Sequence, residues 1–324
     1  LQTLLAESIL SLPDSYRPAA SVQARLTQIL ALNIRKHNAL NGDIVRIFGA
    51  MEGSGLSPIL MKGQSLTSYY PQPFFRKCGD VDLFVGEDGF ESALRVMEDM
   101  GARRKENDLS EKHVTFALGE TEVEVHRFAE QVVAPQNDSA YQSLVREYRS
   151  LPGKVEVGGA AISAFPSQFL PVYLFNHIWH HFKEGGIGLR QFCDLALVLH
   201  GLSCSLDRER LEADLSAVDL LREWRLVGAL LVNRMGLPAS EYPCYEEMDD
   251  KKAERLADLV LGDGNFAAHW NFNVDFGSSI VKKIHSWSIH TRRYYRLARV
   301  SFPIAFRTYV AWFRNRFHKT VGEV

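Results

Sequence analysis

The sequence predicts an α+β fold, with a small mixed sheet between an N-terminal helical segment and a C-terminal helical domain. Apolar residues recur at helical spacing over the first fifty positions, short alternating or apolar runs follow between about 58 and 128, and helical spacing returns beyond about 165. The chain has 324 residues, 46% of them apolar and 23% charged. This is enough material for two or three domains with buried cores.

The N-terminal helical segment is expected over residues 1–52. Its apolar positions include Leu26, Ile29 and Leu30, then Ile44 and Ile47, and this spacing places them on one helical face. Glycines and a serine at 53–55 interrupt the pattern. The segment is therefore predicted to be helix that ends where the sheet-forming region begins.

Residues 53–130 are expected to form the mixed sheet. The apolar run 58–61 reads as a buried strand, and Val81, Leu83 and Val85 alternate with Asp80 and Asp82 as a half-buried strand requires. An amphipathic helix is expected over 90–100, and residues 112–118 and 121–128 resemble a hairpin around Gly-Glu at 119–120. The predicted order is strand, helix, strand, helix, strand, strand.

The rest of the chain is expected to be helical, as a domain over 131–277 and a basic, aromatic tail over 278–324. Helices are predicted over 166–183, 189–201, 207–235 and 249–261. From Phe276 to Gly322 there are ten lysines and arginines and no acidic residue. Such a tail either packs against the acidic body of the protein or contacts an anionic membrane or polyanion.

Composition excludes several classes. The formal charge of -2 argues against a protein whose main partner is nucleic acid, and none is expected as an obligate partner. Four irregularly spaced cysteines form no zinc-binding or disulfide pattern, which favours a reducing, cytoplasmic setting. No apolar run approaches the roughly 18 to 20 residues that cross a bilayer.

The candidate chemistry lies at Asp80 and Asp82. Residues two apart in a strand project from one face, roughly 7 Å apart along the chain. Two carboxylates so placed repel each other unless a cation neutralises them, and a third on a neighbouring strand would complete an oxygen-rich Mg²⁺ site. Glu124 is the expected third ligand, with Glu122 in reserve. A strand whose acidic face meets solvent is the alternative.

A resemblance favours the metal site. Read together, several runs are similar to the bacterial family of uncharacterised nucleotidyltransferases, a branch of the DNA polymerase beta-like superfamily. These are Leu60-Met61-Lys62-Gly63, Tyr70-Pro71, Arg76, Gly79-Asp80-Val81-Asp82-Leu83, Val123-Glu124-Val125-His126, His177, His181, Gly188-Leu189-Arg190 and Asp194. The similarity covers roughly residues 25 to 200. It departs at Gly63-Gln64-Ser65, where the superfamily usually has Gly-Gly or Gly-Ser.

The resemblance implies roles for individual residues. Asp80, Asp82 and Glu124 would be both catalytic and metal-binding, and Gly63 with Ser65 would approach the phosphates of a nucleoside triphosphate. The resemblance further implies that Lys62 and Arg76 supply positive charge to the nucleotide, and that Arg190 contacts the nucleotide or the acceptor. His126 shares the strand face of Glu124 and is expected to orient it, contact the nucleotide or join the metal shell.

Each of these assignments has an alternative. Lys62 would otherwise lie at the surface, Arg76 would pair with an aspartate of the site, and His126 would be an ordinary half-buried histidine. Arg190 is also spaced to pair with Asp194 on a helix. His177, His180 and His181 share one helical face, but packing explains them better than zinc because their only nearby acid is Glu184.

The resulting interpretation is a nucleotidyltransferase core that uses Mg²⁺ or Mn²⁺. It would move a nucleoside monophosphate from a triphosphate to an unidentified acceptor and release pyrophosphate. Two other hypotheses stay open. One is a non-catalytic nucleotide-binding module that regulates a partner, and the other is a peripheral membrane protein that acts through its basic tail.

Overall fold

The computed structural model describes residues 2–77, 79–105, 112–130, 135–184, 187–263, 287–288, 291–292 and 294–310. The chain divides into two compact units. The first comprises residues 1–130 and 143–170, and the second comprises residues 131–142 and 171–324. Each unit is described by itself.

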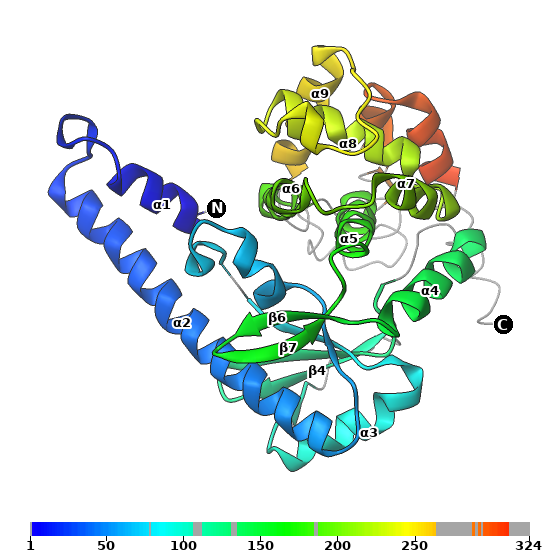
Figure 1. Ribbon diagram of the computed structural model, residues 1–324. Coiled ribbons are helices and arrows are strands. Elements are labelled where there is room, and N and C mark those ends of the chain that lie inside the picture. The colour runs from blue at the N-terminus through cyan, green and yellow to red at the C-terminus, as the bar shows by residue number, and fades with distance from the viewer. Residues whose placement is uncertain are drawn as a thin grey trace, which may run out of the picture. The chain divides into compact units, whose positions relative to one another are not determined.

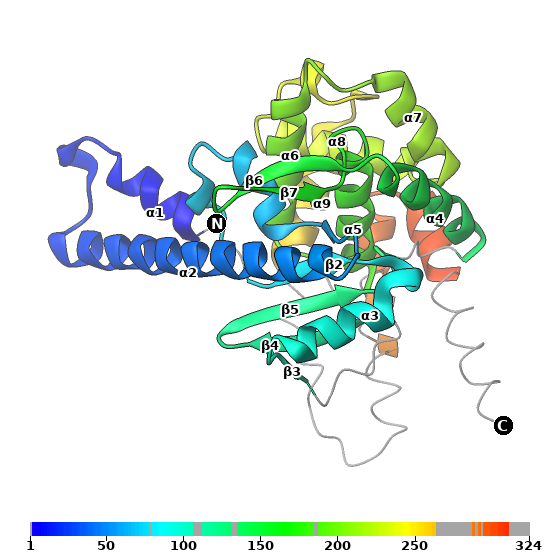
Figure 2. The same ribbon diagram turned by 60° about the horizontal axis from the view of Figure 1, so that its bottom comes forward.

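The N-terminal segment of the first unit is a pair of helices. Helix α1 covers Gln2–Leu10 and helix α2 covers Ala20–Gly53, with a short 3₁₀ turn between them at Asp14–Tyr16. The predicted helical segment thus consists of two helices, because Pro13 and Pro18 lie in the break between them. Figures 1 and 2 show that the N-terminal half of α2 runs beyond the sheet beside α1, while its C-terminal half lies against the sheet.

The first unit contains a mixed seven-stranded sheet in the order β3-β4-β5-β2-β1-β7-β6. The strands are β1 (Ile59–Leu60), β2 (Val81–Phe84), β3 (Arg103–Arg104), β4 (His113–Leu118), β5 (Thr121–His126), β6 (Gly153–Val157) and β7 (Ala160–Ala164). Two 3₁₀ segments, η2 (Gly63–Tyr69) and η3 (Pro73–Phe75), connect β1 to β2, and helix α3 (Gly86–Asp99) follows β2. This architecture confirms the predicted α+β fold with a mixed sheet.

The two faces of the sheet differ because side chains alternate along each strand. Val81 and Leu83 of β2 join Val123 and Val125 of β5 in one hydrophobic core. The same core contains residues of the two long helices of this unit: Leu40, Ile44, Ile47, Phe48 and Met51 from α2, and Phe90, Ala93, Leu94 and Met97 from α3. Both helices therefore cover one face, and the polar residues of β2 and β5 lie on the other.

The hairpin β6–β7 adds two strands to the sheet next to β1, and β6 forms one edge of the sheet. β7 lies parallel to β1, with Leu60 opposite Ala164, and the hairpin follows helix α4 (Pro135–Arg149). Residues 143–170 thus belong to the first unit, although the sequence grouped them with a helical domain beginning at 131. The glycine pair 158–159 turns the chain here with φ of 59° and 80°.

The second unit is helical in its described part. Its helices are α5 (Leu170–Glu184), α6 (Leu189–Leu202), α7 (Arg208–Ala217), α8 (Leu221–Asn233) and α9 (Asp250–Asp263), with a 3₁₀ turn at Ala239–Glu241. The single helix expected over 207–235 was wrong. Asp219 adopts a φ of 55°, outside the right-handed helical region, and separates α7 from α8.

The described part of the basic tail packs within the second unit. Helical residues 294–298 and 302–310 flank a break at 299–301, and Tyr294, Leu297, Val300 and Ile304 are buried. Arg307 pairs with Asp219 and Glu223. Residues 278–286, 289–290, 293 and 311–324 of the predicted tail, which include three of its arginines, lie outside the described residues.

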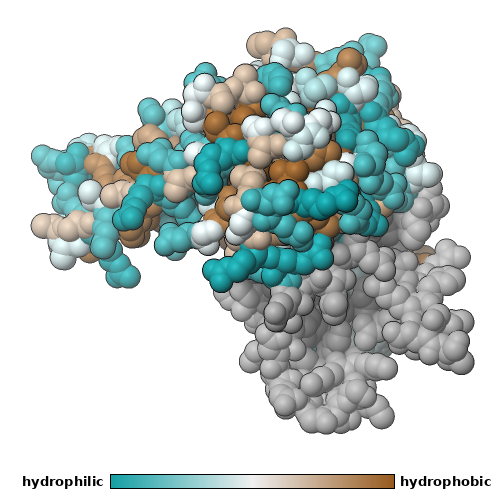
Figure 3. Space-filling model, turned by 90° about the horizontal axis from the view of Figure 1, so that it is seen from below, coloured by the Kyte–Doolittle hydropathy of each residue, from teal (hydrophilic) through white to brown (hydrophobic). Residues whose placement is uncertain are grey.

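The surface is mixed in character. On the face shown in Figure 3 the hydrophobic residues form small groups among hydrophilic ones. Five large apolar side chains of the first fifty residues are exposed, namely Leu5, Leu12, Tyr16, Val22 and Leu32. Among the residues that the structure describes, none of the helices has the length and apolar character needed to span a bilayer.

Candidate active site

The site lies on the polar face of the sheet, where β2 and β5 run parallel. Their register places Asp82 beside Glu124 and Phe84 beside His126. Asp80 immediately precedes β2, so alternation sends it to the face of Asp82. One carboxylate oxygen from each of Asp80, Asp82 and Glu124 lies within 4.8 Å of the others. The structure therefore brings together the three acidic residues that the sequence singled out.

Asp82 is at the centre of this cluster and is fully buried. Its Oδ1 is 3.1 Å from Nζ of Lys62 and 3.3 Å from Nε2 of His126. Burial by itself raises the pKa of the Asp82 carboxyl, but these two cationic groups outweigh burial and hold the pKa well below its usual range. Asp82 is consequently ionised at neutral pH.

The pKa of Asp80 is shifted in the opposite direction. The nearby carboxylate of Asp82, followed by burial, raises the pKa of Asp80, and the ammonium of Lys62 offsets only part of this effect. The raised pKa records repulsion between carboxylates that share one site. A divalent cation placed among them would relieve that repulsion.

Lys62 and His126 are cationic neighbours of the acidic cluster and contact its carboxylates. Burial lowers the pKa of Lys62, but Asp82 and then the other two carboxylates raise it above its ordinary value. Burial also lowers the pKa of His126, whereas its hydrogen bonds to Asp82 and Glu124 raise it and prevail. His126 Nε2 is 3.2 Å from Oε2 of Glu124. Both residues are thus favoured in their cationic forms.

The segment after β1 contains Gly63 and Ser65, the two residues that the sequence predicts to lie near phosphates. Gly63 has a φ of 68°, and a Cβ there would lie 3.4 Å from the main-chain oxygen of Asp80. Glycine is favoured at this position because its backbone is left-handed and passes close to the loop before β2. Ser65 is buried, and its hydroxyl has no hydrogen-bond partner among the described residues.

The two arginines of the predicted site belong to different units of the chain. Arg76 is buried in the first unit and immediately follows the 3₁₀ turn η3. Arg190 belongs to the second unit, where it is half-buried in the first turn of α6. The glycines 185–186 that precede α6 lie outside the described residues.

His113 is a neighbour of the site that sequence reasoning missed. It is the antiparallel partner of His126 across β4 and β5, with ring centroids 4.8 Å apart. One ligand atom from each of His113, Glu124 and His126 also lies within 4.8 Å of the others. The hairpin prediction contained the needed signal, because pairing around residues 119–120 places His113 opposite His126.

Comparison with known proteins identifies the family. A family model described as "Uncharacterised nucleotidyltransferase" matches residues 1–236. The chain belongs to this family. The match confirms the resemblance seen in the sequence and extends it in both directions along the chain. No curated protein matches the sequence.

The chain is also similar to several solved structures. The antibiotic-resistance factor ANT(2'')-Ia is 14% identical over 56% of this chain and 92% of its own, with a TM-score of 0.41. The lincosamide antibiotic adenylyltransferase LnuA is 12% identical over 48% and 94%, with a TM-score of 0.34. A nucleotidyltransferase-like protein from Paracoccidioides brasiliensis is 12% identical over 66% and 93%, with a TM-score of 0.37. Because these TM-scores are below 0.5, the family assignment depends on the family model alone.

Proposed function

We propose that this protein is a metal-dependent nucleotidyltransferase that transfers a nucleoside monophosphate from a nucleoside triphosphate to an acceptor and releases pyrophosphate. The observation that carries the proposal is the cluster of Asp80, Asp82 and Glu124 on one sheet face, in a chain of a nucleotidyltransferase family. Asp82 is fully buried, and its contacts with Lys62 and His126 keep its pKa low, so it can offer an ionised carboxylate to a metal ion.

The donor set fits Mg²⁺ or Mn²⁺. All three ligands offer carboxylate oxygens, which these hard cations prefer, and Oδ2 of Asp82 is buried without a hydrogen-bond partner among the described residues. When bound, such a cation supplies positive charge to the triphosphate and to the leaving pyrophosphate. The proposal assigns Asp80, Asp82 and Glu124 to hold it.

The remaining residues act by position and charge. His126 contacts both Asp82 and Glu124, and so fixes the relative orientation of two carboxylates on neighbouring strands. Lys62 balances the charge of Asp82 before the substrate arrives, at a distance of 3.1 Å. We propose that the Lys62 ammonium also contacts the phosphates of the bound triphosphate. The backbone at Gly63 and the hydroxyl of Ser65 would donate neutral hydrogen bonds to the same phosphates.

The proposed reaction is an in-line displacement at the α-phosphorus. An oxygen of the acceptor forms the new bond while the bond to pyrophosphate breaks, and the proton of that oxygen passes to a carboxylate. We assign this proton to Glu124, whose side chain is 20% exposed and is reachable from solvent, whereas Asp82 is not. Arg76 and Arg190 are proposed as further nucleotide contacts.

The acceptor is the unassigned part of the proposed reaction. Any acceptor must carry a nucleophilic oxygen, such as a hydroxyl or a phosphate. We propose a cytoplasmic location, in keeping with the free thiols of Cys193, Cys204 and Cys244. Mass spectrometry of products formed from labelled triphosphates in a cell extract would identify the acceptor.

Metal-dependent binding tests the proposal directly. Isothermal titration with ATP should show stronger binding in Mg²⁺ or Mn²⁺ than in chelator, and Asp82→Asn should remove most of that gain. Asp99→Asn is the matched control, because Asp99 is exposed on α3. Equal metal-assisted binding by parent and Asp82→Asn would refute the site. Metal-assisted binding without transfer to any acceptor would instead support a regulatory nucleotide-binding module.

A further inference from the structure

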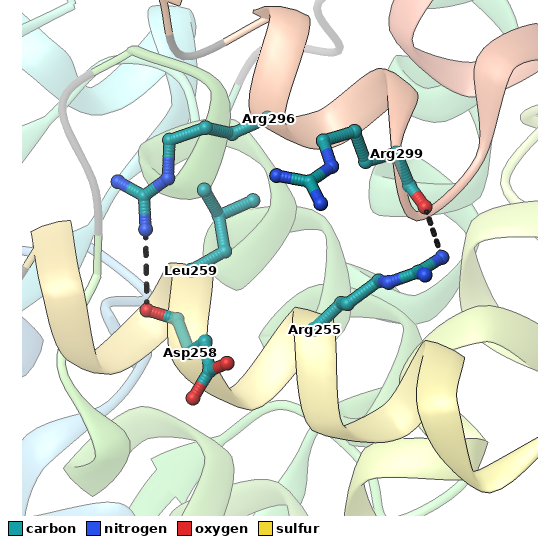
Figure 4. A pocket seen from close by; sticks show the side chains of 5 residues that line it. All are labelled: Arg255, Asp258, Leu259, Arg296 and Arg299. Carbon is teal, nitrogen blue, oxygen red and sulfur yellow. Dashed lines mark hydrogen bonds between the residues drawn. The ribbon is translucent and has the colours of Figure 1, made fainter.

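The second unit contains a pocket that the proposed reaction does not use. It measures about 250 Å³ and is lined by Arg255, Asp258, Leu259, Arg296 and Arg299 (Figure 4). Three guanidinium groups thus border one cavity of a size suited to a small ligand. The site lies entirely within the second unit.

Two helical segments build this pocket. Arg255, Asp258 and Leu259 have i, i+3 and i+4 spacing on α9, so they share one face of that helix. Arg296 and Arg299 come from the basic tail, the first within helical residues 294–298 and the second in the turn that follows. The pocket therefore exists only where the tail packs beside α9.

Main-chain carbonyls hold two of the arginines in place. Nη2 of Arg296 donates to the main-chain oxygen of Asp258 at 3.3 Å, and Nη1 of Arg255 donates to the main-chain oxygen of Arg299 at 3.1 Å. Each bond crosses between the two segments and uses a neutral acceptor. These bonds fix the guanidinium groups without neutralising their charge.

The pocket carries an excess of positive charge. Among the described residues, neither Arg255 nor Arg299 has a carboxylate within 4.0 Å, in contrast to Arg307, which pairs with Asp219 and Glu223. Figure 4 shows the guanidinium groups of Arg296 and Arg299 on either side of Leu259, with the Asp258 carboxylate directed away from them. Among the described residues, the charges of Arg255 and Arg299 are therefore not balanced by a carboxylate in contact.

A glycine makes room for one of the arginines. A Cβ at Gly262 would lie 2.9 Å from Nη2 of Arg296, so any larger residue would displace that guanidinium group. Leu259, which is buried, contributes apolar surface to the same lining. The pocket thus combines fixed cationic donors with a small apolar floor.

We propose that this pocket binds a phosphate group. Guanidinium groups match phosphate oxygens with two parallel hydrogen bonds, and several arginines around one cavity suit an anion of more than one negative charge. The phosphate has two possible sources, a soluble compound such as pyrophosphate or the headgroup of an anionic lipid. Tyr295, Phe302 and Phe306 are exposed on the same tail segment, which would suit a membrane surface.

Titration with inorganic pyrophosphate in the presence of a chelator tests the proposal. Removing divalent metal suppresses binding at the candidate active site, and Asp82→Asn should leave this binding unchanged. We expect Arg299→Gln and Arg255→Gln each to weaken it by roughly three- to tenfold. Arg292→Gln is the matched control, since Arg292 is exposed in the tail but does not line the pocket.

Vesicles distinguish the two sources. Co-sedimentation with phosphatidylcholine vesicles containing phosphatidic acid should depend on Arg299 and Arg255 if the phosphate belongs to a lipid. Either pyrophosphate binding or vesicle binding that the two pocket variants weaken, but Arg292→Gln does not, supports the pocket. Equal losses in all three variants would indicate diffuse attraction to a basic tail and overturn the proposal, as would the absence of binding in both assays. Unfolding curves of each variant verify that the fold is intact.

Discussion

Replacement of Arg307 by methionine tests whether the basic tail stabilises the second unit. Glu223 of α8 is 1% exposed, and its Oε1 contacts Nη2 of Arg307. Nη1 of Arg307 also lies 2.5 Å from Oδ2 of Asp219. Methionine keeps an apolar stem of similar length and removes the charge. The variant would therefore leave the buried carboxylate of Glu223 without its cationic partner.

The size of the effect follows from the burial of Glu223. A buried charge that loses its partner costs about 3–5 kcal/mol, or becomes protonated. Protonating a glutamate at pH 7, starting from its reference pKa of about 4.3, costs about 3.7 kcal/mol and sets an upper limit. The Arg307 side chain is 35% exposed, so solvent already screens part of the pair. We expect the free energy of unfolding to fall by about 2–3 kcal/mol.

Urea denaturation followed by tryptophan fluorescence is a suitable assay, because Trp224 is buried next to Glu223 in α8. Asp219→Asn is the control, since its side chain is 57% exposed and its pair with Arg307 should contribute less than about 1 kcal/mol. Glu223→Gln combined with Arg307→Met should recover part of the loss, because the unpaired charge is removed.

A loss in Arg307→Met no larger than that in Asp219→Asn would refute the buried-pair argument. Deletion of residues 278–324 extends the test, because it removes Arg307 together with the buried tail residues Leu297 and Ile304. The deletion should lower thermal stability without lipid or nucleic acid present. A stable, monodisperse truncated protein would favour a solvated binding arm instead.

Three further predictions concern the first unit. Glu124→Gln should abolish nucleotide transfer, whereas Glu122→Gln should retain it because the Glu122 side chain is 44% exposed. The reverse result in transfer assays would assign the third carboxylate to Glu122, two residues earlier on the strand. Burial lowers the pKa of His37, so below about pH 6.5 the unfolded chain takes up a proton that the folded protein resists. The free energy of unfolding should then decrease as the pH decreases, by at most about 1.36 kcal/mol per pH unit. Denaturation curves between pH 7 and pH 5 should show a weaker pH dependence for His37→Gln. Gly63→Ala should lower stability by about 1–2 kcal/mol in thermal melts because the φ of Gly63 is 68°. Gly79→Ala is the control and should not lower it, because a Cβ at Gly79 would meet open space. Equal effects of the two substitutions would contradict the backbone argument.

Local patterns in the sequence were sufficient for the fold class and for singling out Asp80 and Asp82 as a pair of carboxylates on one strand face. Alternation along residues 81–85 and 121–126 separates apolar from acidic positions, and the structure has strands there with the predicted faces. The hairpin and the helix of residues 86–99 were also predictable from periodicity. These features depend on neighbours within a few residues, which a sequence displays directly.

Other features depended on contacts between distant parts of the chain. The parallel pairing that sets Asp82 beside Glu124, the approach of Lys62 to Asp82, and the addition of β6 and β7 to the sheet each join segments separated by twenty residues or more. Periodicity contains no information about register between strands that are not consecutive.

The helical half shows the same division. The sequence by itself determined that the tail is basic, aromatic and helical in spacing, because these are local properties. The tertiary structure decided the different environments of its arginines. Arg307 pairs with a buried glutamate, whereas Arg299 borders a pocket beside α9. Whether a positive charge is neutralised or left available depends on which acidic group the packing of distant helices brings within a few ångströms, and that distance is a property of the folded chain.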